Sequence, residues 1–180
     1  IKLYFISKKK STKRNFNLRS FKNFEKLEKV IKKINPEYII NCIGVTHHHK
    51  TYEDKNNTKT INSALPLYLS KLCLKYKIHF VHISTDCVFS GKSGNYSEKS
   101  RKNPISYYGL TKSKGEVKNE YSTTIRTSFI GPEVKTKNQL LNWFLSQKNK
   151  VNGFDKAFFS GLTSLELSNI IYTYFLKTNY

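Results

Sequence analysis

The chain has 180 residues, 38% of them hydrophobic and 14% aromatic, and its 32 Lys and Arg residues against 12 Asp and Glu residues give a formal net charge of +20. This length and composition allow a buried core and exclude an intrinsically disordered protein. We find no apolar run of about eighteen residues and no secretory leader, so we expect a cytoplasmic protein with no membrane partner. Cys42, Cys73 and Cys87 have no paired spacing, which excludes a disulfide framework or zinc knuckle and predicts reduced, buried thiols.

The positive charge looks like a compositional bias. All but four of the basic residues are Lys, and they are spread along the chain among many Asn residues. Binding of phosphates and bases favours Arg, because its guanidinium presents several donors in a fixed geometry. We therefore expect no nucleic-acid partner, and a basic nucleic-acid module is kept only as an alternative class.

The two ends of the sequence suggest a piece of a longer protein. The chain contains no Met and opens on Ile1 inside an apolar run, and its last residues follow another apolar run without a tail. We expect a missing amino-terminal segment and a clipped carboxyl end.

In the first half of the chain, strand and helix patterns alternate. Residues 1–7 form an apolar strand candidate before a basic turn, and apolar residues spaced by three and four predict an amphipathic helix over 21–34. A short β-branched run predicts a buried parallel strand over 38–44. A second helix is expected over 58–76, and a second buried strand over 78–84.

The second half begins with a long loop over 85–104, which contains Gly and Pro and has no periodicity. We then expect a helix from Ser106 or Tyr107 to about Asn119, a strand over 123–126 and a helix around 140–145. Near the end, a short strand should lead into a helix capped by Thr163 or Ser164. The late aromatic side chains are expected in the core, namely Phe158, Phe159, Tyr172 and Phe175.

Alternating strands and helices indicate βαβ units, so the sequence predicts the α/β class with a parallel sheet and helices on both faces. Ligands of such sheets bind at the carboxyl ends of the strands. This places residues 41–44, residues 84–86 and the long loop on one rim, where we look for chemistry.

Tyr108 and Lys112 are the first candidates for that chemistry. Four residues are just over one helical turn, so both side chains project from the same face, and a nearby ammonium lowers the pKa of a phenol. The spacing is not specific by itself, because Tyr4 and Lys8 share it at a strand end. Tyr108, however, follows a strand that ends in Ser84-Thr85-Asp86, which supplies a hydroxyl able to hold a carbonyl oxygen at the rim.

This combination resembles the extended short-chain dehydrogenase/reductase superfamily, and within it the dTDP-4-dehydrorhamnose reductase family. The motif Tyr108-Gly109-Leu110-Thr111-Lys112 is its centre. The residues that carry the resemblance fall in family order at 36–42, 61–66, 82–91, 94–98, 103–104, 108–116 and 125–131. Several motifs in order are more specific than any one of them.

The resemblance implies a Rossmann-like doubly wound parallel sheet, truncated at its amino end. It implies reduction of the keto group of a nucleotide-linked 4-keto-6-deoxysugar by NADPH, or by NADH, in deoxysugar and cell-surface polysaccharide biosynthesis. Tyr108 would donate the proton, Lys112 would lower the pKa of Tyr108 and bind the nicotinamide ribose, and Thr85 would hold the carbonyl oxygen. These roles suit hydride addition, which creates negative charge on oxygen.

The resemblance also assigns binding residues and domains. Cofactor-binding residues would be Asn41, Cys42, Gly44, Asn62, Ser84 and Lys112. Substrate-binding residues would be Thr85, Asp86, Val88, Phe89, Tyr108, Arg126 and Trp143. Residues 1–131 would form a partial NAD(P)-binding domain, and residues 132–180 the start of a smaller sugar-nucleotide-binding region on the same core.

The sequence departs from the family pattern at its beginning. The glycine-rich turn that holds the cofactor pyrophosphate is absent, since the first glycine is Gly44, and Asn17 stands where the family commonly has an acidic residue. The first strand, phosphate loop and first helix would therefore be missing, and activity of the chain by itself is in doubt. The basic turn over 8–14 favours NADPH over NADH, because cations accommodate the extra phosphate.

Two other functions stay open. An NAD-dependent epimerase or dehydratase of nucleotide sugars would use the same Tyr and Lys, and a non-catalytic fragment would keep only a binding or structural role. A homodimer is the expected assembly. We expect no metal, because adjacent His47, His48 and His49 on a loop rarely converge on one ion.

Overall fold

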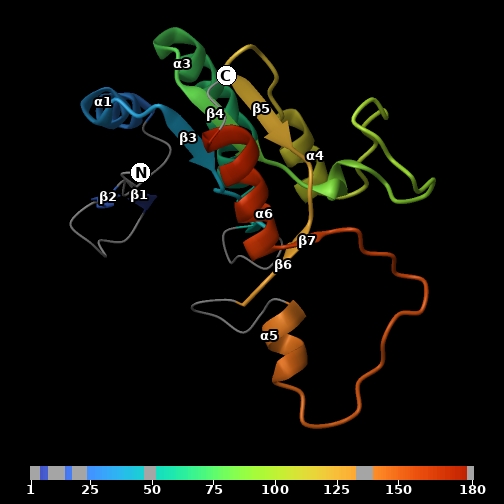
Figure 1. Ribbon diagram of the computed structural model, residues 1–180. Helices are drawn as coiled ribbons and strands as arrows, with labels where there is room; N and C mark the ends of the chain where they lie inside the picture. Colours follow the sequence, from blue (N-terminus) through green and yellow to red (C-terminus); the bar gives the residue numbers. More distant parts are fainter. Residues whose placement is uncertain (1–4, 8–14, 18–23, 47–51, 133–139, 178–180) are drawn as a thin grey trace. The chain divides into compact units, whose positions relative to one another are not determined.

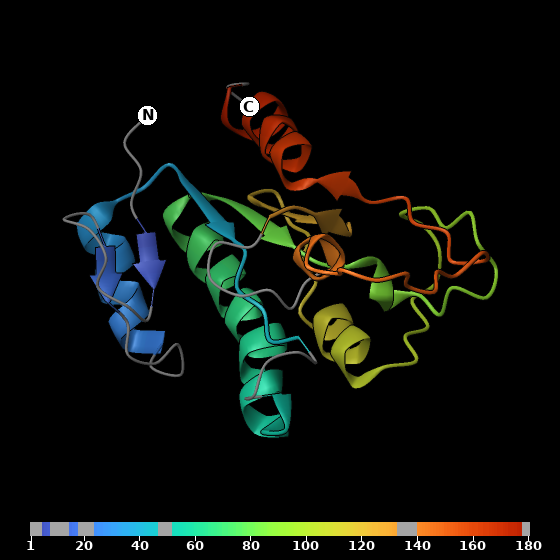
Figure 2. The ribbon, with the colours of Figure 1, turned by 90° about the horizontal axis from the view of Figure 1, so that it is seen from below.

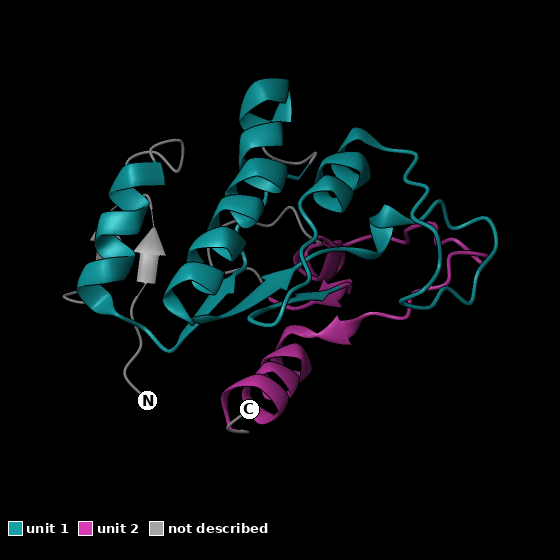
Figure 3. Cartoon of the chain, turned by 90° about the horizontal axis from the view of Figure 1, so that it is seen from above, with its two compact units in different colours: residues 1–125 teal, residues 126–180 magenta. Residues whose placement is uncertain are grey.

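The computed structural model describes residues 5–7, 15–17, 24–46, 52–132 and 140–177 (Figure 1). The chain divides into two compact units, residues 1–125 and residues 126–180 (Figure 3), and each is described by itself. The domain boundary after residue 131 that the sequence suggests stays a prediction. The basic turn over 8–14 and the three histidines over 47–49 lie outside the described residues.

The centre of the first unit is a three-stranded parallel sheet. It contains β3 (Tyr38–Asn41), β4 (His79–Ile83) and β5 (Ser122–Ile125), in the order β3-β4-β5. Asn41 pairs with His82, and His82 pairs with Thr124, so the three strands end at the same edge. The predicted parallel α/β class is confirmed.

Three helical segments run without interruption between β3 and β4. They are α2 (Lys55–Lys59), the π-helical η2 (Thr60–Ala64) and α3 (Leu65–Tyr76), which Figure 2 shows as one long helical rod. The rod begins earlier than the sequence predicts, because the Asp54 side chain accepts a hydrogen bond from the amide of Asn57 and caps it.

Helix α1 (Phe24–Ile34) precedes β3 and buries Leu27 and Ile31. Its predicted start at Phe21 lies outside the described residues. Figure 3 shows α1, α3 and α4 (Tyr107–Lys114) on the same side of the sheet. Among the described residues, the remaining α-helices belong to the second unit.

The core of the first unit lies between this helical layer and the sheet. Leu65 and Cys73 of α3 are fully buried, and Phe80 of β4 is 1% exposed. Cys42 and Cys87 are exposed, so the prediction of buried thiols holds for Cys73 alone. Both exposed thiols follow the ends of strands, where side chains can face the rim.

Helix α4 is shorter than its sequence suggests. Ser106 caps its beginning with a side-chain oxygen that accepts the amide hydrogen of Gly109, as the sequence predicts. The helix stops at Gly115, where an added β-carbon would overlap the backbone oxygen of Asn62. This close approach of two backbones ends the helix before the predicted limit at Asn119.

Strands β1 (Phe5–Ser7) and β2 (Asn15–Asn17) pair in parallel with each other as a separate two-stranded sheet. The long loop after β4 is confirmed, apart from one 3-10 turn, η3 (Asp86–Val88). None of the helices in the described ranges is long and apolar enough to cross a membrane.

In its described residues, 126–132 and 140–177, the second unit contains a small parallel pair and three helical segments. Strands β6 (Phe129–Ile130) and β7 (Leu162–Thr163) pair, and α5 (Leu140–Leu145), α6 (Ser164–Ile171) and the π-helical η4 (Tyr172–Leu176) complete it. Thr163 caps α6 as predicted, by accepting the amide hydrogen of Glu166.

The prediction that the late aromatic residues form core is wrong for three of them. Phe158 is 98% exposed, and Phe159 and Tyr172 are also exposed. Both phenylalanines lie in a segment without regular secondary structure, and α5 buries none of its residues. A unit of this size has too few packed elements to enclose all its aromatic side chains.

Candidate active site

Tyr108 and Thr85 come together at the edge where the strands end. Thr85 follows β4, and Tyr108 is the second residue of α4. The Thr85 side chain lies near enough to the phenol to act on it, in the direction that lowers its pKa. Two residues separated by a long loop in sequence are therefore neighbours in the structure.

The Thr85 side chain is held by the turn that follows it. Its Oγ1 accepts a hydrogen bond from the amide of Cys87 (3.2 Å) and donates one to Oδ1 of Asp86 (3.2 Å), and Thr85 is 5% exposed. The first of these bonds caps η3. The hydroxyl is therefore fixed in place before any substrate arrives.

Burial raises the pKa of Tyr108 above its ordinary value of 10, and this effect exceeds the opposing effect of the Thr85 side chain; Cys87 and Asp86 raise the pKa further. The sequence predicted the opposite direction, through the ammonium of Lys112. The structure directs that ammonium to another partner. At neutral pH the phenol is consequently protonated and able to donate its proton.

Lys112 is buried, with 3% of its surface exposed, and its Nζ donates a hydrogen bond to the carbonyl oxygen of Ile83 (2.6 Å). Burial lowers the pKa of Lys112 to about 8, against the opposing effects of Glu116 and Cys42. Nζ therefore lies at the end of β4, beside the peptide bond that precedes Ser84. A buried amine so placed can supply positive charge to the rim.

A glycine allows α4 to approach the turn after β4. An added β-carbon at Gly109 would overlap the carbonyl oxygen of Cys87 and would lie 3.0 Å from the β-carbon of Pro104. Only a residue without a side chain fits between the helix and η3. Since Gly109 directly follows Tyr108, this contact brings the beginning of α4 against the turn that contains Cys87.

Asn62 connects the loop after β3 to α4. Its Oδ1 accepts from the amide of Val45 (2.8 Å), and its Nδ2 donates to the carbonyl oxygen of Val45 (2.9 Å) and to Oγ1 of Thr111 (3.1 Å). The side chain is fully buried, and these three bonds satisfy its amide. Asn62 thus fixes the loop after β3 relative to α4.

Asn41 is also turned inward. Its Nδ2 lies 3.1 Å from Nδ1 of His82, and its Oδ1 accepts the amide hydrogen of Ile43. The amide donates to Nδ1, so the hydrogen of the imidazole sits on Nε2. In the part of the chain that the structure describes, that buried Nε2 has no hydrogen-bond partner. Burial lowers the pKa of His82 to about 3, which keeps the ring neutral.

Ser84 joins β4 to the far end of α4. Its Oγ donates to Oε1 of Glu116 (2.9 Å), and Oε2 of Glu116 pairs with Nζ of Lys102 (3.0 Å). The predicted cofactor residue Ser84 is therefore bonded inside the protein, and its side chain is buried.

The other predicted residues of the first unit lie close to this group in sequence, with different exposure. Asp86 is exposed, whereas Val88 is fully buried and presents no side-chain surface to a ligand. Phe89 stacks on Tyr96 with ring centroids 4.4 Å apart. Arg126 and Trp143 belong to the second unit, and their substrate roles stay predictions.

The absent side chain of Gly44 leaves open space just after β3. An added β-carbon there would meet only Oδ1 of Asn62, at an ordinary contact distance of 3.7 Å, and Gly44 has no positive φ. The protein's own packing therefore does not require glycine at this position. The missing side chain leaves room beside the strand end, as close approach of a bound nucleotide would need.

A parallel sheet with helices packed on it and polar residues gathered at the strand ends places the chain in the Rossmann-like α/β class. The model of one family, described as the RmlD substrate binding domain, matches residues 9–151, and the chain belongs to this family. A curated relative, the dTDP-4-keto-6-deoxy-D-glucose reductase of Streptomyces niveus, is 33% identical over 88 residues, which are 48% of this chain and 31% of the relative.

Two solved structures are similar. A hypothetical dTDP-4-dehydrorhamnose reductase of Sulfolobus tokodaii has a TM-score of 0.63 and 34% identity, over 69% of this chain and 46% of that chain. The dTDP-4-dehydrorhamnose reductase of Bacillus anthracis str. Ames, solved in complex with NADP, has a TM-score of 0.59 and 26% identity, over 66% and 45%. The chain thus spans less than half the length of these relatives.

Sequence reasoning assigned no role to Glu116, His82 or Gly109. The signal for Glu116 was available, because it follows Lys112 by the same four residues that separate Tyr108 from Lys112. The roles of His82 and Gly109 depend on the residues that they contact in the fold, Asn41 for His82 and Cys87 for Gly109. No spacing in the sequence reports that.

Proposed function

We propose that this protein reduces the keto group of a nucleotide-linked 4-keto-6-deoxysugar, with NADPH as the preferred reductant. The observation that carries the proposal is the grouping of Tyr108, Thr85 and the buried amine of Lys112 at the edge where parallel strands end. The printed names of the relatives point to the same reaction class, since they are reductases of dTDP-linked keto sugars.

The two hydroxyls would bind the substrate's carbonyl oxygen from the protein side. As that oxygen gains negative charge, hydrogen bonds from fixed donors strengthen, so they stabilise the transition state more than the ground state. The phenol of Tyr108 is protonated at neutral pH, so it holds a proton that passes from the phenolic oxygen to the new alkoxide. Lys112 supplies positive charge that favours the phenolate left behind.

The cofactor assignment rests on the rim and on the relatives. A nicotinamide coenzyme, when bound, supplies the hydride. Gly44 leaves space at the end of β3, and Lys112 could donate to the ribose. The other residues proposed to line its site are Asn41, Cys42, Asn62 and Ser84. NADPH is preferred over NADH because residues 8–14 are basic and the relative from Bacillus anthracis was solved with NADP.

The substrate residues are proposed for each unit by itself. Thr85, Asp86 and Phe89 lie in or beside the turn after β4, and Arg126 and Trp143 belong to the second unit, which we propose as part of the sugar-nucleotide region. A homodimer, a cytoplasmic location and the absence of a nucleic-acid partner stay predictions.

The test is to incubate the purified protein with NADPH and dTDP-4-keto-6-deoxysugars and to follow the nicotinamide absorbance and the mass of the product. We expect one NADPH consumed for each sugar reduced, with slower turnover on NADH. Conversion of the sugar without net consumption of NADPH would instead indicate an epimerase or dehydratase. Binding of NADPH without conversion of any keto sugar would indicate a non-catalytic role.

A further inference from the structure

Glu116 is a buried carboxylate that the proposed reaction does not use. It stands just after α4, directly beyond the capping residue Gly115, and its side chain is 6% exposed. One oxygen accepts from Ser84 and the other pairs with Lys102, whose side chain is 33% exposed and also donates to the carbonyl oxygen of Ser113 (2.9 Å). Burying a carboxylate costs free energy unless partners of this kind stabilise it, so the hydrogen bond and the ion pair together allow Glu116 to be buried.

The partner of Glu116 on β4 is constrained on several sides. The amide of Ser84 donates to the carbonyl oxygen of Ile125 on β5 (2.7 Å), and its hydroxyl donates to Glu116. The peptide bond that joins Ile83 to Ser84 carries the carbonyl oxygen that accepts Nζ of Lys112 (2.6 Å). Glu116 therefore holds Ser84, and Ser84 directly follows Ile83, whose carbonyl oxygen accepts the hydrogen bond from Lys112.

Glu116 also acts on Lys112 through its charge. Burial disfavours the charged amine, and the negative charge of Glu116 is the largest opposing effect, followed by the Cys42 thiol. The charges of both groups also act on His82, and this ring is neutral because burial lowers its pKa to about 3. In a site shielded from water, one nearby anion changes the charge state of a buried amine strongly.

We propose that Glu116 is a positioning residue of the active site, which fixes Ser84 at the end of β4 and keeps the Lys112 side chain charged and directed at the carbonyl oxygen of Ile83. The importance of this role for turnover rests on the proposed function. The link between Glu116 and Lys112 does not, because it concerns groups of the protein alone.

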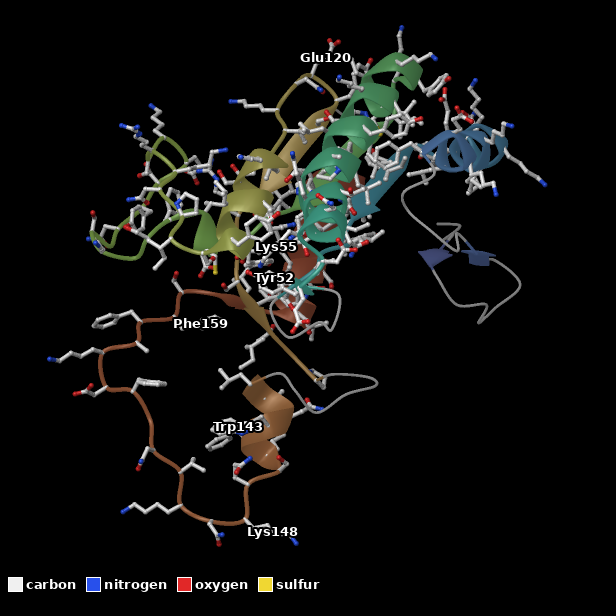
Figure 4. All side chains as sticks on the ribbon, turned by 180° about the vertical axis from the view of Figure 1, so that it is seen from behind. Tyr52, Lys55, Glu120, Trp143, Lys148 and Phe159 are labelled. Carbon is white, nitrogen blue, oxygen red and sulfur yellow. The ribbon has the colours of Figure 1, made fainter. Side chains whose placement is uncertain are left out.

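The first test measures the pKa of Lys112 by NMR in ligand-free protein labelled at the lysine ε-carbons, with its signal identified by its loss in Lys112→Met. Glu116→Gln removes the anion and keeps the shape, so we expect the pKa of Lys112 to fall by about one unit. Ser84→Ala removes a hydrogen bond and no charge, so a much smaller change is expected. The matched control is Glu120→Gln, at an exposed carboxylate four residues further on (Figure 4), and it should change nothing.

An equal pKa of Lys112 in Glu116→Gln and in the control overturns the proposal. Should Glu116→Gln fail to fold, the pKa of Lys112 is measured instead in Lys102→Gln, which removes the ion-pair partner of Glu116. Loss of the paired cation leaves the charge of Glu116 less compensated, and the pKa of Lys112 must then rise. A fall or no change in that variant also overturns the proposal.

The second test uses the dependence of kcat/KM on pH in keto-sugar reduction. We expect the alkaline loss of activity to begin about one unit lower in Glu116→Gln than in the wild type, and at the wild-type pH in Glu120→Gln. A merely structural role of Glu116 would lower activity at every pH without moving this limb. If the wild type reduces no keto sugar, the proposed function fails, while the NMR titration still decides the role of Glu116.

Discussion

At the scale of single residues, the site depends on groups whose pKa values differ from those in water. Tyr108 is kept protonated and Lys112 is made easier to deprotonate, both mainly by burial. Thr85 contributes no charge, but its hydroxyl is held by the turn and acts on the pKa of the phenol. The chemistry therefore depends on desolvation as much as on which residues are present.

Thr85 gives a direct test of the fixed hydroxyl. Thr85→Val keeps the shape and removes the donor, so we expect kcat to fall by about 10²-fold, as when one donor to a developing oxyanion is removed. Thr85→Ser keeps the hydroxyl and should retain most of the activity. Steady-state kinetics of the two variants measure the difference, and similar losses in both would show that the hydroxyl is not the essential group.

His82 predicts a stability that depends on pH. Its pKa is about 3 in the folded protein and 6.5 in a solvated histidine, so the unfolded chain binds the extra proton first as the pH falls. The free energy of unfolding should therefore drop between about pH 6.5 and pH 3, with a contribution from His82 on the order of a few kcal/mol.

Urea denaturation at several pH values measures this contribution. In His82→Phe the ring is retained and the titrating group is lost, so the decrease on acidification should be smaller than in the wild type. The control is His79→Phe on the same strand, where the ring stacks on Tyr38 and is half-buried. Equal acid sensitivity of the wild type and His82→Phe would contradict the burial of a neutral imidazole.

At the scale of elements, the position of α4 decides whether its residues reach the strand ends. Gly109 meets the turn after β4, Gly115 meets the backbone of Asn62, and the Asn62 side chain bonds to Thr111 in the middle of the helix. The helix is therefore held at both ends and in its middle. Its tyrosine and lysine occupy defined places without help from a ligand.

Gly109→Ala tests this packing, because two effects predict opposite signs. In a helix with open surroundings the change would stabilise the protein by about 0.5–1 kcal/mol. Here the added β-carbon would overlap the carbonyl oxygen of Cys87, and we expect a loss of about 1–3 kcal/mol together with reduced turnover.

Chemical denaturation compares Gly109→Ala with Gly153→Ala, where an added β-carbon would have nothing within 4 Å. The control should change stability little. A Gly109→Ala variant at least as stable as the wild type would mean that the close contact with Cys87 does not hold the helix.

At the scale of the whole molecule, the elements with a periodic pattern of apolar residues could be predicted from the sequence. The features that depend on contacts between distant segments could not. The β-branched runs around Ile39 and Val81 and the helical spacing from Leu27 to Ile31 each report burial along one element, so the parallel sheet and its helices could be predicted. The end of α4 could not, because it is set by a backbone from another segment.

The candidate site divides in the same way. Tyr108 and Lys112 were recognisable from their spacing, and Thr85 from its place after a strand. The partner of Lys112 was not, since a carbonyl oxygen is present in every residue and only the fold selects that of Ile83. For the same reason the direction of the pKa shift of Tyr108 was predicted incorrectly.

The central claim is that the phenol of Tyr108 donates the proton in a keto-sugar reduction. The most direct measurement compares kcat for Tyr108→Phe and Tyr107→Phe with NADPH and a dTDP-4-keto-6-deoxysugar. Tyr107 is the neighbouring residue, and its hydroxyl donates instead to the backbone of Lys55 (3.0 Å). We predict a loss of about 10²–10⁴-fold for Tyr108→Phe and a nearly unchanged kcat for Tyr107→Phe. Equal activity of the two variants would contradict the account.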